Sequence, residues 1–357
     1  MIEFYNEQVA LYELETRRNR GRKADVDSFV DNDKTKIAWD RELKIQLSKL
    51  NSFAFDPKSI VVSQYRPFCK TPAYFNRRFN SMVYQMPQIF PEPGIENLVI
   101  CVCGAGVSKE FSTVMSNVLP DVQLLANGQC FPFYTYEKVE SKSKGLLETG
   151  GERVGNYIRR ENISDAMLRK FQDRYGDRKI SKEDIFYYVY GILHSQSYRE
   201  RFAADLKKQL PRIPLVDDFH TFSKAGRQLA KLHLNYETLK PHHLKEIVTG
   251  SKANFKVNQM RYKSKTDKSR IIYNDTLTLD GIPPNVDKYV VNGKSALDWI
   301  VERYAITTHK ESGIVNNPND WCKEIGDERY IVDLVKRIVT LSVESVRIID
   351  ALPEMVF

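Results

Sequence analysis

Hydrophobic residues recur at helical spacing in the middle of the chain. Ser181 and Asp184 have the spacing of a capping box, so a helix is predicted to begin there. Residues 194–197 interrupt the pattern, and apolar residues then recur every four positions over 198–210, which predicts a second helix. Pro211 ends it, because proline lacks a backbone donor and clashes with the preceding turn. The basic residues of the second helix are predicted to be solvated: Arg199, Arg201, Lys207 and Lys208.

The rest of the chain alternates between helical and strand-like patterns. Apolar positions at helical spacing predict helices over residues 3–16, 25–50, 163–175, 219–234, 294–304 and 330–349. Runs of β-branched and aromatic residues predict strands over 60–68, 97–103, 122–125 and 130–136, and a hairpin formed by 253–262 and 270–279. Two polar stretches that contain glycine, residues 138–152 and 306–320, are predicted to be loops.

These patterns predict an α+β fold class. A β-rich unit takes its strands from residues 59–137 and 253–292, a helical insertion covers 155–236, and helices lie at both ends. The predicted division has five segments: an N-terminal helical linker (1–50), a β-rich part (51–150), a helical subdomain (151–240), a part with the hairpin and the polar loop (241–325), and a C-terminal helix (326–357).

Composition narrows the class of protein. The 357 residues carry a formal net charge of +8, which is compatible with a nucleic-acid partner without requiring one. No apolar run approaches the roughly 20 residues of a membrane span, and the start lacks the basic and apolar regions of a signal peptide. The five scattered cysteines favour reduced thiols in a cytoplasmic protein over a disulfide framework.

Three fragments of catalytic motifs occur, and each is incomplete. Residues 101–106 place Gly-Ala-Gly after a predicted strand, but Lys109 stands where the dinucleotide fingerprint needs a third glycine or alanine. Residues 317–320, Asn-Pro-Asn-Asp, lack the second proline and the aromatic ring of the Asn-Pro-Pro-Tyr motif of adenine methyltransferases. Lys294 ends a Gly-Lys pair without the first glycine of a phosphate loop. We therefore predict no catalytic, cofactor-binding or metal-binding residue in this chain.

Basic residues gather in places that suit DNA. Residues 251–270 carry seven Lys or Arg against one Asp on the predicted hairpin, and a two-stranded ribbon fits the major groove. A second cluster interleaves basic and aromatic residues over 65–79, and a third is the polar loop at 309–317. The predicted DNA-binding residues are Arg66, Lys70, Arg77, Arg78, Lys256, Arg261, Lys263, Lys265, Lys268, Arg270, Lys310 and Asn316. The alternative interpretations are a solvated hairpin tip, aromatic residues placed in the core, and simple turn formation in the polar loop.

Several segments resemble the C-terminal region of Type ISP restriction-modification enzymes. The longest are D-I-F-Y-Y-V-Y-G-I-L-H-S (184–195), S-Y-R-E-R-F-A-A-D-L-K-K (197–208) and L-P-R-I-P (210–214). Others are residues 65–68, 98–106, 225–237, 289–300 and 312–321, so that the resemblance covers roughly residues 60–350. It implies a target recognition domain of a bacterial enzyme that joins a nuclease, a helicase-like ATPase and an adenine methyltransferase in a single chain.

The resemblance also sets the expected partners and cofactors. Double-stranded DNA and the methyltransferase and helicase-like domains, in the same or a companion chain, are the expected partners, in the cytoplasm and without a membrane. S-adenosylmethionine, ATP and Mg are expected only in upstream domains, and no cofactor in this chain. We thus expect a sequence-specific DNA recognition domain that directs adenine methylation and ATP-driven restriction carried out elsewhere. Two alternatives stay open: an enzyme domain that binds a nucleotide or S-adenosylmethionine at residues 104–106, and a coupling module that does not touch DNA.

Overall fold

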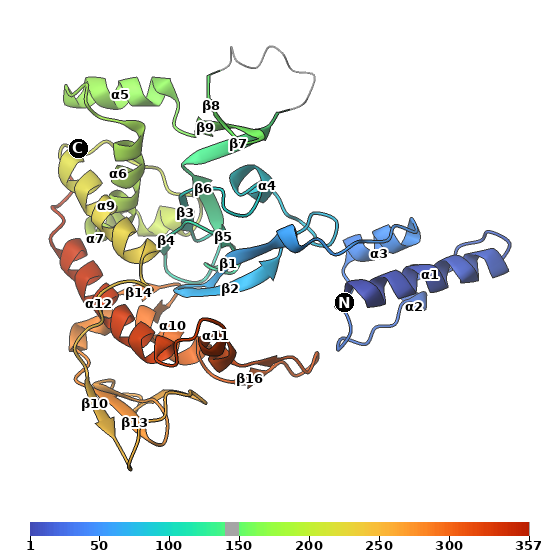
Figure 1. Ribbon diagram of the computed structural model, residues 1–357. Helices are drawn as coiled ribbons and strands as arrows, with labels where there is room; N and C mark the ends of the chain where they lie inside the picture. The colour runs from blue at the N-terminus through green and yellow to red at the C-terminus, as the bar shows by residue number, and fades with distance from the viewer. Residues whose placement is uncertain (140–149, 357) are drawn as a thin grey trace.

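The computed structural model describes residues 1–139 and 150–356 (Figure 1). The helices are α1 (Ile2–Arg18), α2 (Val26–Phe29), α3 (Arg41–Ser48), α4 (Met86–Ile89), α5 (Asp165–Tyr175), α6 (Lys182–His194), α7 (Gln196–Arg201), α8 (Ala203–Leu206), α9 (Phe219–Leu234), α10 (Ala296–Arg303), α11 (Pro318–Glu324) and α12 (Tyr330–Asp350). Short 3-10 helices, η1 (Pro57–Ser59) and η3 (Pro284–Lys288), precede β1 and β14. The strands are β1 (Ile60–Arg66), β2 (Cys69–Tyr74), β3 (Val99–Val102), β4 (Thr113–Ser116), β5 (Leu119–Pro120), β6 (Gln129–Pro132), β7 (Tyr134–Lys138), β8 (Glu152–Val154), β9 (Tyr157–Glu161), β10 (Lys245–Val248), β11 (Arg261–Tyr262), β12 (Arg270–Ile272), β13 (Leu277–Asp280), β14 (Val290–Val291), β15 (Lys294–Ser295), β16 (Thr307–Thr308) and β17 (Val315–Asn316).

The strands form small sheets that are mostly antiparallel. Sheets of order β2-β1-β5 and β4-β3-β6 lie at the centre of the molecule, with β7-β9-β8 above them in the view of Figure 1. The four-stranded sheet β10-β13-β12-β11 lies at the opposite end, and β14–β15 and β16–β17 are hairpins. Within these sheets, β1 and β5 pair in parallel, and the other pairings are antiparallel. This arrangement of small sheets among helices confirms the predicted α+β fold class.

Helices α6 and α9 approach each other through a pair of glycines. A Cβ atom added at Gly226 would overlap the carbonyl oxygen of Tyr187, and one added at Gly191 would overlap that of Phe222. Because neither glycine has a side chain, the two helix backbones touch directly. Aromatic and aliphatic side chains of both helices fill the core around this contact.

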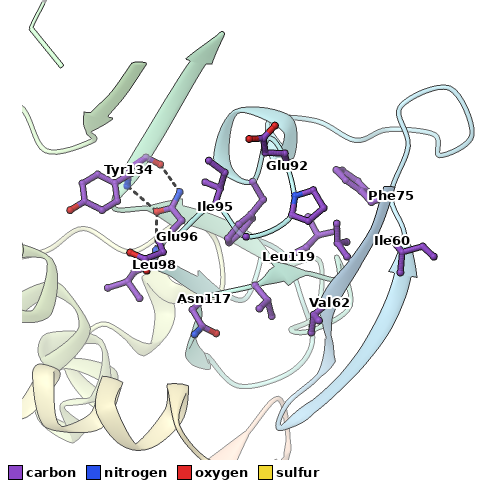
Figure 2. Close-up of a pocket in the computed structure, with 16 residues that line it drawn as sticks. Ile60, Val62, Phe75, Glu92, Ile95, Glu96, Leu98, Asn117, Leu119 and Tyr134 are labelled. Carbon is purple, nitrogen blue, oxygen red and sulfur yellow. Dashed lines mark hydrogen bonds between the residues drawn. The ribbon is translucent and has the colours of Figure 1, made fainter. Parts of the chain in front are cut away.

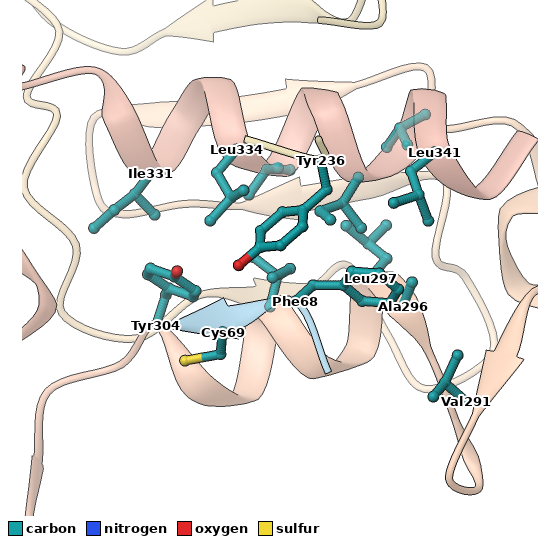
Figure 3. Close-up of a cluster of buried hydrophobic side chains, with 14 of the residues drawn as sticks. Phe68, Cys69, Tyr236, Val291, Ala296, Leu297, Tyr304, Ile331, Leu334 and Leu341 are labelled. Carbon is teal, nitrogen blue, oxygen red and sulfur yellow. The ribbon is translucent and has the colours of Figure 1, made fainter. Parts of the chain in front are cut away.

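Helix α12 lies over the largest buried cluster (Figure 3). Its residues Ile331, Leu334 and Leu341 face Phe68, at the turn between β1 and β2, and Tyr236, just after α9. The same cluster includes α10 and the inner side of the four-stranded sheet, so it joins segments from across the chain. A separate small cluster forms from residues between Tyr5 and Phe53, in α1, α3 and the loops next to them.

Predictions that rest on local signals are confirmed. Ser181 and Asp184 form the capping box at the start of α6. The helices predicted over 219–234 and 330–349 match α9 and α12. None of the helices within the described ranges combines the length and hydrophobicity that crossing a membrane requires.

Several predicted elements are wrong, and several observed strands were not predicted. Residues 122–125 form a turn instead of a strand, with the amide of Leu124 bonded to the carbonyl of Asp121. The helix predicted over 198–210 is divided into α7 and α8, and residues 25–50 hold only the short α2 and α3. In the predicted hairpin the first arm pairs only through β11, and the second arm is itself divided into the paired strands β12 and β13. Strands β8, β9 and β10 were not predicted. The polar loop at 306–320 contains β16, β17 and the start of α11.

Arg199 corrects the prediction that the basic residues of this region are solvated. Its Nε donates to the carbonyl oxygen of Leu193 at 2.8 Å, and its guanidinium lies 5.7 Å from the ring centroid of Phe111. The break between α6 and α7 turns the side chain back onto the end of α6, where a carbonyl lacks a helical partner. Arg201, Lys207 and Lys208 are exposed as predicted.

The predicted loop at residues 138–152 falls largely on residues 140–149, which lie outside the described part of the chain. Its ends, Lys138 and Glu152, belong to β7 and β8. The five-segment division of the chain stays a prediction.

Candidate nucleic-acid interface

The polar segment before β11 and the β16–β17 hairpin are held side by side. Asn319 is buried in α11, where its Oδ1 accepts from the amide of Val257 at 2.8 Å and its Nδ2 donates to the carbonyl of Val257 at 2.7 Å. The amide of Ile306, just before β16, donates to the carbonyl of Asn258 at 2.8 Å. Asn319 belongs to residues 317–320, the incomplete match to the Asn-Pro-Pro-Tyr motif. Its contacts show that it connects α11 to the segment before β11.

The segment 256–265 and the β16–β17 hairpin carry cationic side chains without local partners. Lys256, Arg261, Lys265 and Lys310 are exposed, and within the described residues their side chains make no hydrogen bond or ion pair. Asn316, on β17, is also exposed. Charges and amides of this kind are available to phosphate oxygens and base edges, since no protein group has to release them first. We call these five residues the junction surface.

Two other basic residues of the β11–β12 hairpin already pair with acidic side chains. Lys268 pairs with Asp287 at 3.1 Å and Asp298 at 3.0 Å, and Arg270 pairs with Asp280 at 3.0 Å. The charge count over residues 251–270 missed these acids, because they lie outside that window and are brought in by folding.

Lys263 has a partner within the hairpin turn. It pairs with Asp267 at 2.7 Å, and the pKa of Asp267 lies well below its ordinary value because Lys263 and Ser269 donate to the carboxylate. The local positive charge of the hairpin is therefore smaller than the sequence suggests.

The second predicted cluster divides in the same way. Arg66 pairs with Asp121 at 3.0 Å, and Lys70 pairs with Glu237 at 2.7 Å. Each of these basic side chains is only 19% exposed. Arg77 and Arg78 are exposed, and no side-chain partner for them occurs in residues 1–139 or 150–356.

The aromatic residues between these basic residues pack largely within the protein. Phe68 is 1% exposed, and Phe79 packs edge-on against Phe53 and Tyr74. Tyr65 is the exception, because its ring is stacked by Arg66 at 4.0 Å and stays 37% exposed.

The glycine turn after β3 does not form a dinucleotide site. Strand β3 pairs antiparallel with both β4 and β6, whereas the dinucleotide fold needs a parallel βαβ unit. A Cβ at Gly104 would overlap the carbonyl oxygen of Asn127, and Gly106 has φ +76°, so the two glycines serve the turn. Residues 107–112 that follow are not helical, and no helix terminus is available for a pyrophosphate there.

A pocket of about 640 Å³ opens beside the edge of β1 (Figure 2). Apolar side chains such as Ile60, Val62 and Leu119 line it, together with the carboxylates Glu92 and Glu96. No Lys or Arg belongs to its lining, so it does not suit a phosphate group. Within the described part of the chain, no group of three or more His, Cys, Asp or Glu side chains is placed to hold a metal ion.

Comparisons with known proteins identify the family of this chain. The sequence model described as the Type ISP C-terminal specificity domain matches residues 1–334. Among solved structures, a nuclease-deletion mutant of the Type ISP restriction-modification enzyme LlaGI, in complex with a DNA substrate mimic, is 32% identical with a TM-score of 0.83. The ATP-dependent Type ISP enzyme LlaBIII bound to DNA is 30% identical with a TM-score of 0.84, and DrdV in a DNA complex is 32% identical with a TM-score of 0.82.

These matches extend over nearly the whole chain but only part of each relative. They cover 100%, 99% and 100% of this chain and 26%, 21% and 33% of the chains of LlaGI, LlaBIII and DrdV, respectively. This chain thus spans between about a fifth and a third of the length of those proteins. The comparison with curated protein sequences gave no match.

Proposed function

The chain belongs to the family of Type ISP C-terminal specificity domains, and from this premise we propose that it recognises double-stranded DNA in a sequence-specific manner. The relatives LlaGI, LlaBIII and DrdV were all solved with DNA or a DNA mimic, at 30–32% identity to this chain. In this proposal the chain selects the site at which other domains methylate an adenine and start ATP-driven restriction.

The observation that carries the proposal is the set of exposed cations that lack an acidic partner. On the junction surface, Lys256, Arg261, Lys265 and Lys310 are free to bind phosphates, while Asn316 can bond to a base edge. Arg77 and Arg78 offer a second phosphate contact. The remaining predicted residues have protein partners in the free chain and would have to exchange them on binding: Arg66, Lys70, Lys263, Lys268 and Arg270.

The proposal assigns no chemistry to this chain itself. S-adenosylmethionine, ATP and Mg would bind to methyltransferase and helicase-like domains, in the same or a companion polypeptide. These domains would also be its protein partners, in the bacterial cytoplasm. The chain would then supply phosphate contacts for affinity and a few polar side chains for specificity.

A salt series with a matched charge control tests the proposal. The chain is incubated with a pool of random duplexes, the bound fraction is sequenced, and affinity for a recovered duplex is measured at several salt concentrations. A DNA-binding domain gives an enriched motif and a logarithm of affinity that falls linearly with the logarithm of salt, by about 0.9 per phosphate contact. Replacing Lys256, Arg261, Lys265 and Lys310 together by alanine is expected to reduce that slope by about 3 to 4.

The control removes the same charge from elsewhere on the surface. Lys170, Lys179, Lys224 and Lys231 are exposed on the α5–α9 side of the molecule and have no assigned contact. Their fourfold alanine variant should keep the slope of the unmodified chain. Equal slopes in all three proteins would contradict the junction surface, and an absence of binding at low salt would reject DNA recognition by this chain. S-adenosylmethionine binding would favour the alternative of an enzyme domain.

A further inference from the structure

The loop between β2 and α4 presents large apolar side chains to solvent. Met82 is 77% exposed and Tyr84 is 74% exposed, the highest values among the exposed large hydrophobic side chains of the described chain. The hydroxyl of Tyr84 lies 3.3 Å from the sulfur of Met82, so the two side chains stand together. Their exposure leaves apolar surface in water without a partner in this chain.

Contacts of Asn76, Phe79 and Ser81 hold the base of the loop in place. The loop therefore keeps Met82 and Tyr84 exposed instead of folding them against the protein. Phe79 packs against Phe53 at 5.9 Å and Tyr74 at 6.1 Å between ring centroids. Asn76 bonds through its backbone amide to the side chain of Asn80 at 2.7 Å and through its own Nδ2 to Ser59. Ser81, next to Met82, donates to the carboxylate of Asp40 in the N-terminal part.

The backbone at the tip of the loop adopts an unfavourable conformation. Met82 has φ +52° and Tyr84 has φ +47°, in the left-handed region that residues other than glycine rarely adopt. Such conformations are energetically unfavourable and persist where the surroundings enforce them, often at sites that clamp a ligand. A flexible loop would relax, so here the anchors hold Met82 and Tyr84 outward.

The charge around the loop indicates a polyanionic partner. Between Pro57 and Pro91 the chain carries five basic residues and no Asp or Glu. Arg77 and Arg78 lie in the loop itself and are exposed. Of the acids that flank this stretch, Asp56 accepts a hydrogen bond from the amide of Lys58, and Glu92 directly follows Pro91. Asp40, which Ser81 contacts, accepts from the amide of Leu43.

We propose that residues 76–85 form a wedge that enters the DNA duplex, with Met82 and Tyr84 inserted at a base step and Arg77 and Arg78 bound to the flanking phosphates. This deepens the proposed function and rests on it. Apolar wedges partly unstack a base step, and the contacts that the wedge makes offset the lost stacking. A protein partner is the competing occupant, but the exposed Arg77 and Arg78 beside the tip, and the absence of Asp and Glu from residues 57–91, favour DNA.

Permanganate reactivity of thymines tests the wedge, because permanganate attacks thymines that have lost stacking. The probe is the duplex recovered from the binding selection, saturated with protein. The unmodified chain is expected to make thymines reactive at one step of the duplex. The double variant Met82→Ala/Tyr84→Ala should lose this reactivity and bind about 5- to 150-fold more weakly, which is the contribution of about 1–3 kcal/mol from base–aromatic stacking expressed as a ratio of affinities. Met82→Leu/Tyr84→Phe should keep both properties.

Two further variants separate the wedge from other effects. Arg77→Ala/Arg78→Ala should lower the salt slope by about 2 and keep the reactive step when the DNA is saturated. Met167→Ala removes an apolar side chain that is 42% exposed on α5 and should change nothing. Thermal unfolding of each variant confirms that it folds, which is expected because the replaced side chains are exposed.

The outcomes distinguish the wedge from DNA recognition as such. If the unmodified chain binds its duplex without a reactive step, and the double variant binds equally well, the wedge is wrong and DNA recognition stands. That result would make Met82 and Tyr84 a surface for a protein partner. If the unmodified chain binds no duplex, both proposals fall.

Discussion

Replacing Gly226 by alanine has two opposite effects on stability: the higher helix propensity of alanine stabilises the protein, and the added Cβ disturbs the packing of α6 against α9. On an exposed helix position the change would stabilise the protein by about 1 kcal/mol, because alanine loses less conformational entropy than glycine. In this structure the new Cβ would overlap the carbonyl oxygen of Tyr187 in α6 and come within 2.8 Å of the amide nitrogen of Gly191, where ordinary contact begins near 3.4 Å. Both neighbours are backbone atoms inside a helix, so they cannot rotate away.

The expected result is a net loss of stability. Overpacking a core costs about 1–3 kcal/mol and occasionally more. The upper part of this range applies to Gly226, because relief requires α6 and α9 to separate and so loosens the aromatic core between them. After the gain in propensity is subtracted, Gly226→Ala should lower the free energy of unfolding by about 2 kcal/mol.

Urea unfolding of the variant, followed by far-UV circular dichroism, measures this loss. Gln228→Ala is the matched control, since Gln228 is exposed on the same helix two residues away and should leave stability within about 0.5 kcal/mol of the unmodified chain. A Gly226→Ala variant that is equally stable, or more stable, would refute the close approach of α6 and α9.

Further predictions concern buried polar groups. Asn319→Ala should lower the free energy of unfolding by about 1–3 kcal/mol, because the amide and carbonyl of Val257 lose their hydrogen-bond partners. Glu324→Ala, at an exposed position of the same helix, should leave it unchanged. Equal midpoints of urea unfolding for the two variants would contradict this prediction. Burial lowers the pKa of His233 to about 3 and lowers that of His194 as well, so the unfolded chain takes up protons near pH 6.5 that the folded chain does not bind. Stability should therefore fall between pH 7 and pH 5, by up to about 1.4 kcal/mol per pH unit for each ring, and His194→Gln should reduce this slope; a flat profile would contradict the burial of these rings.

The sequence could not predict which of the candidate DNA-binding residues have acidic partners in the folded chain. Lys265 and Lys268 look equivalent in the sequence, since both lie in the basic stretch that precedes β12. In the structure Lys265 is exposed, whereas Lys268 pairs with Asp287 and Asp298, which are 19 and 30 residues away. No local pattern could identify these acids as its partners.

The wedge residues were overlooked for a related reason. The sequence shows a mixture of aromatic and basic residues in this region, without indicating which aromatic rings are buried. Phe79 belongs to the anchored base of the loop, while Met82 and Tyr84 project from its tip. The difference depends on packing against Phe53, in a separate part of the chain.

The sequence by itself determined the features that depend on a few neighbouring residues. The capping box at Ser181 and the amphipathic pattern of α12 involve contacts within about one helical turn, so their signal is present in the local order of residues. The family could also be identified from segments that resemble known members. Only the tertiary structure decided which cations are free, which glycines bring α6 and α9 together, and where β10 forms, because these depend on contacts between residues far apart in the chain.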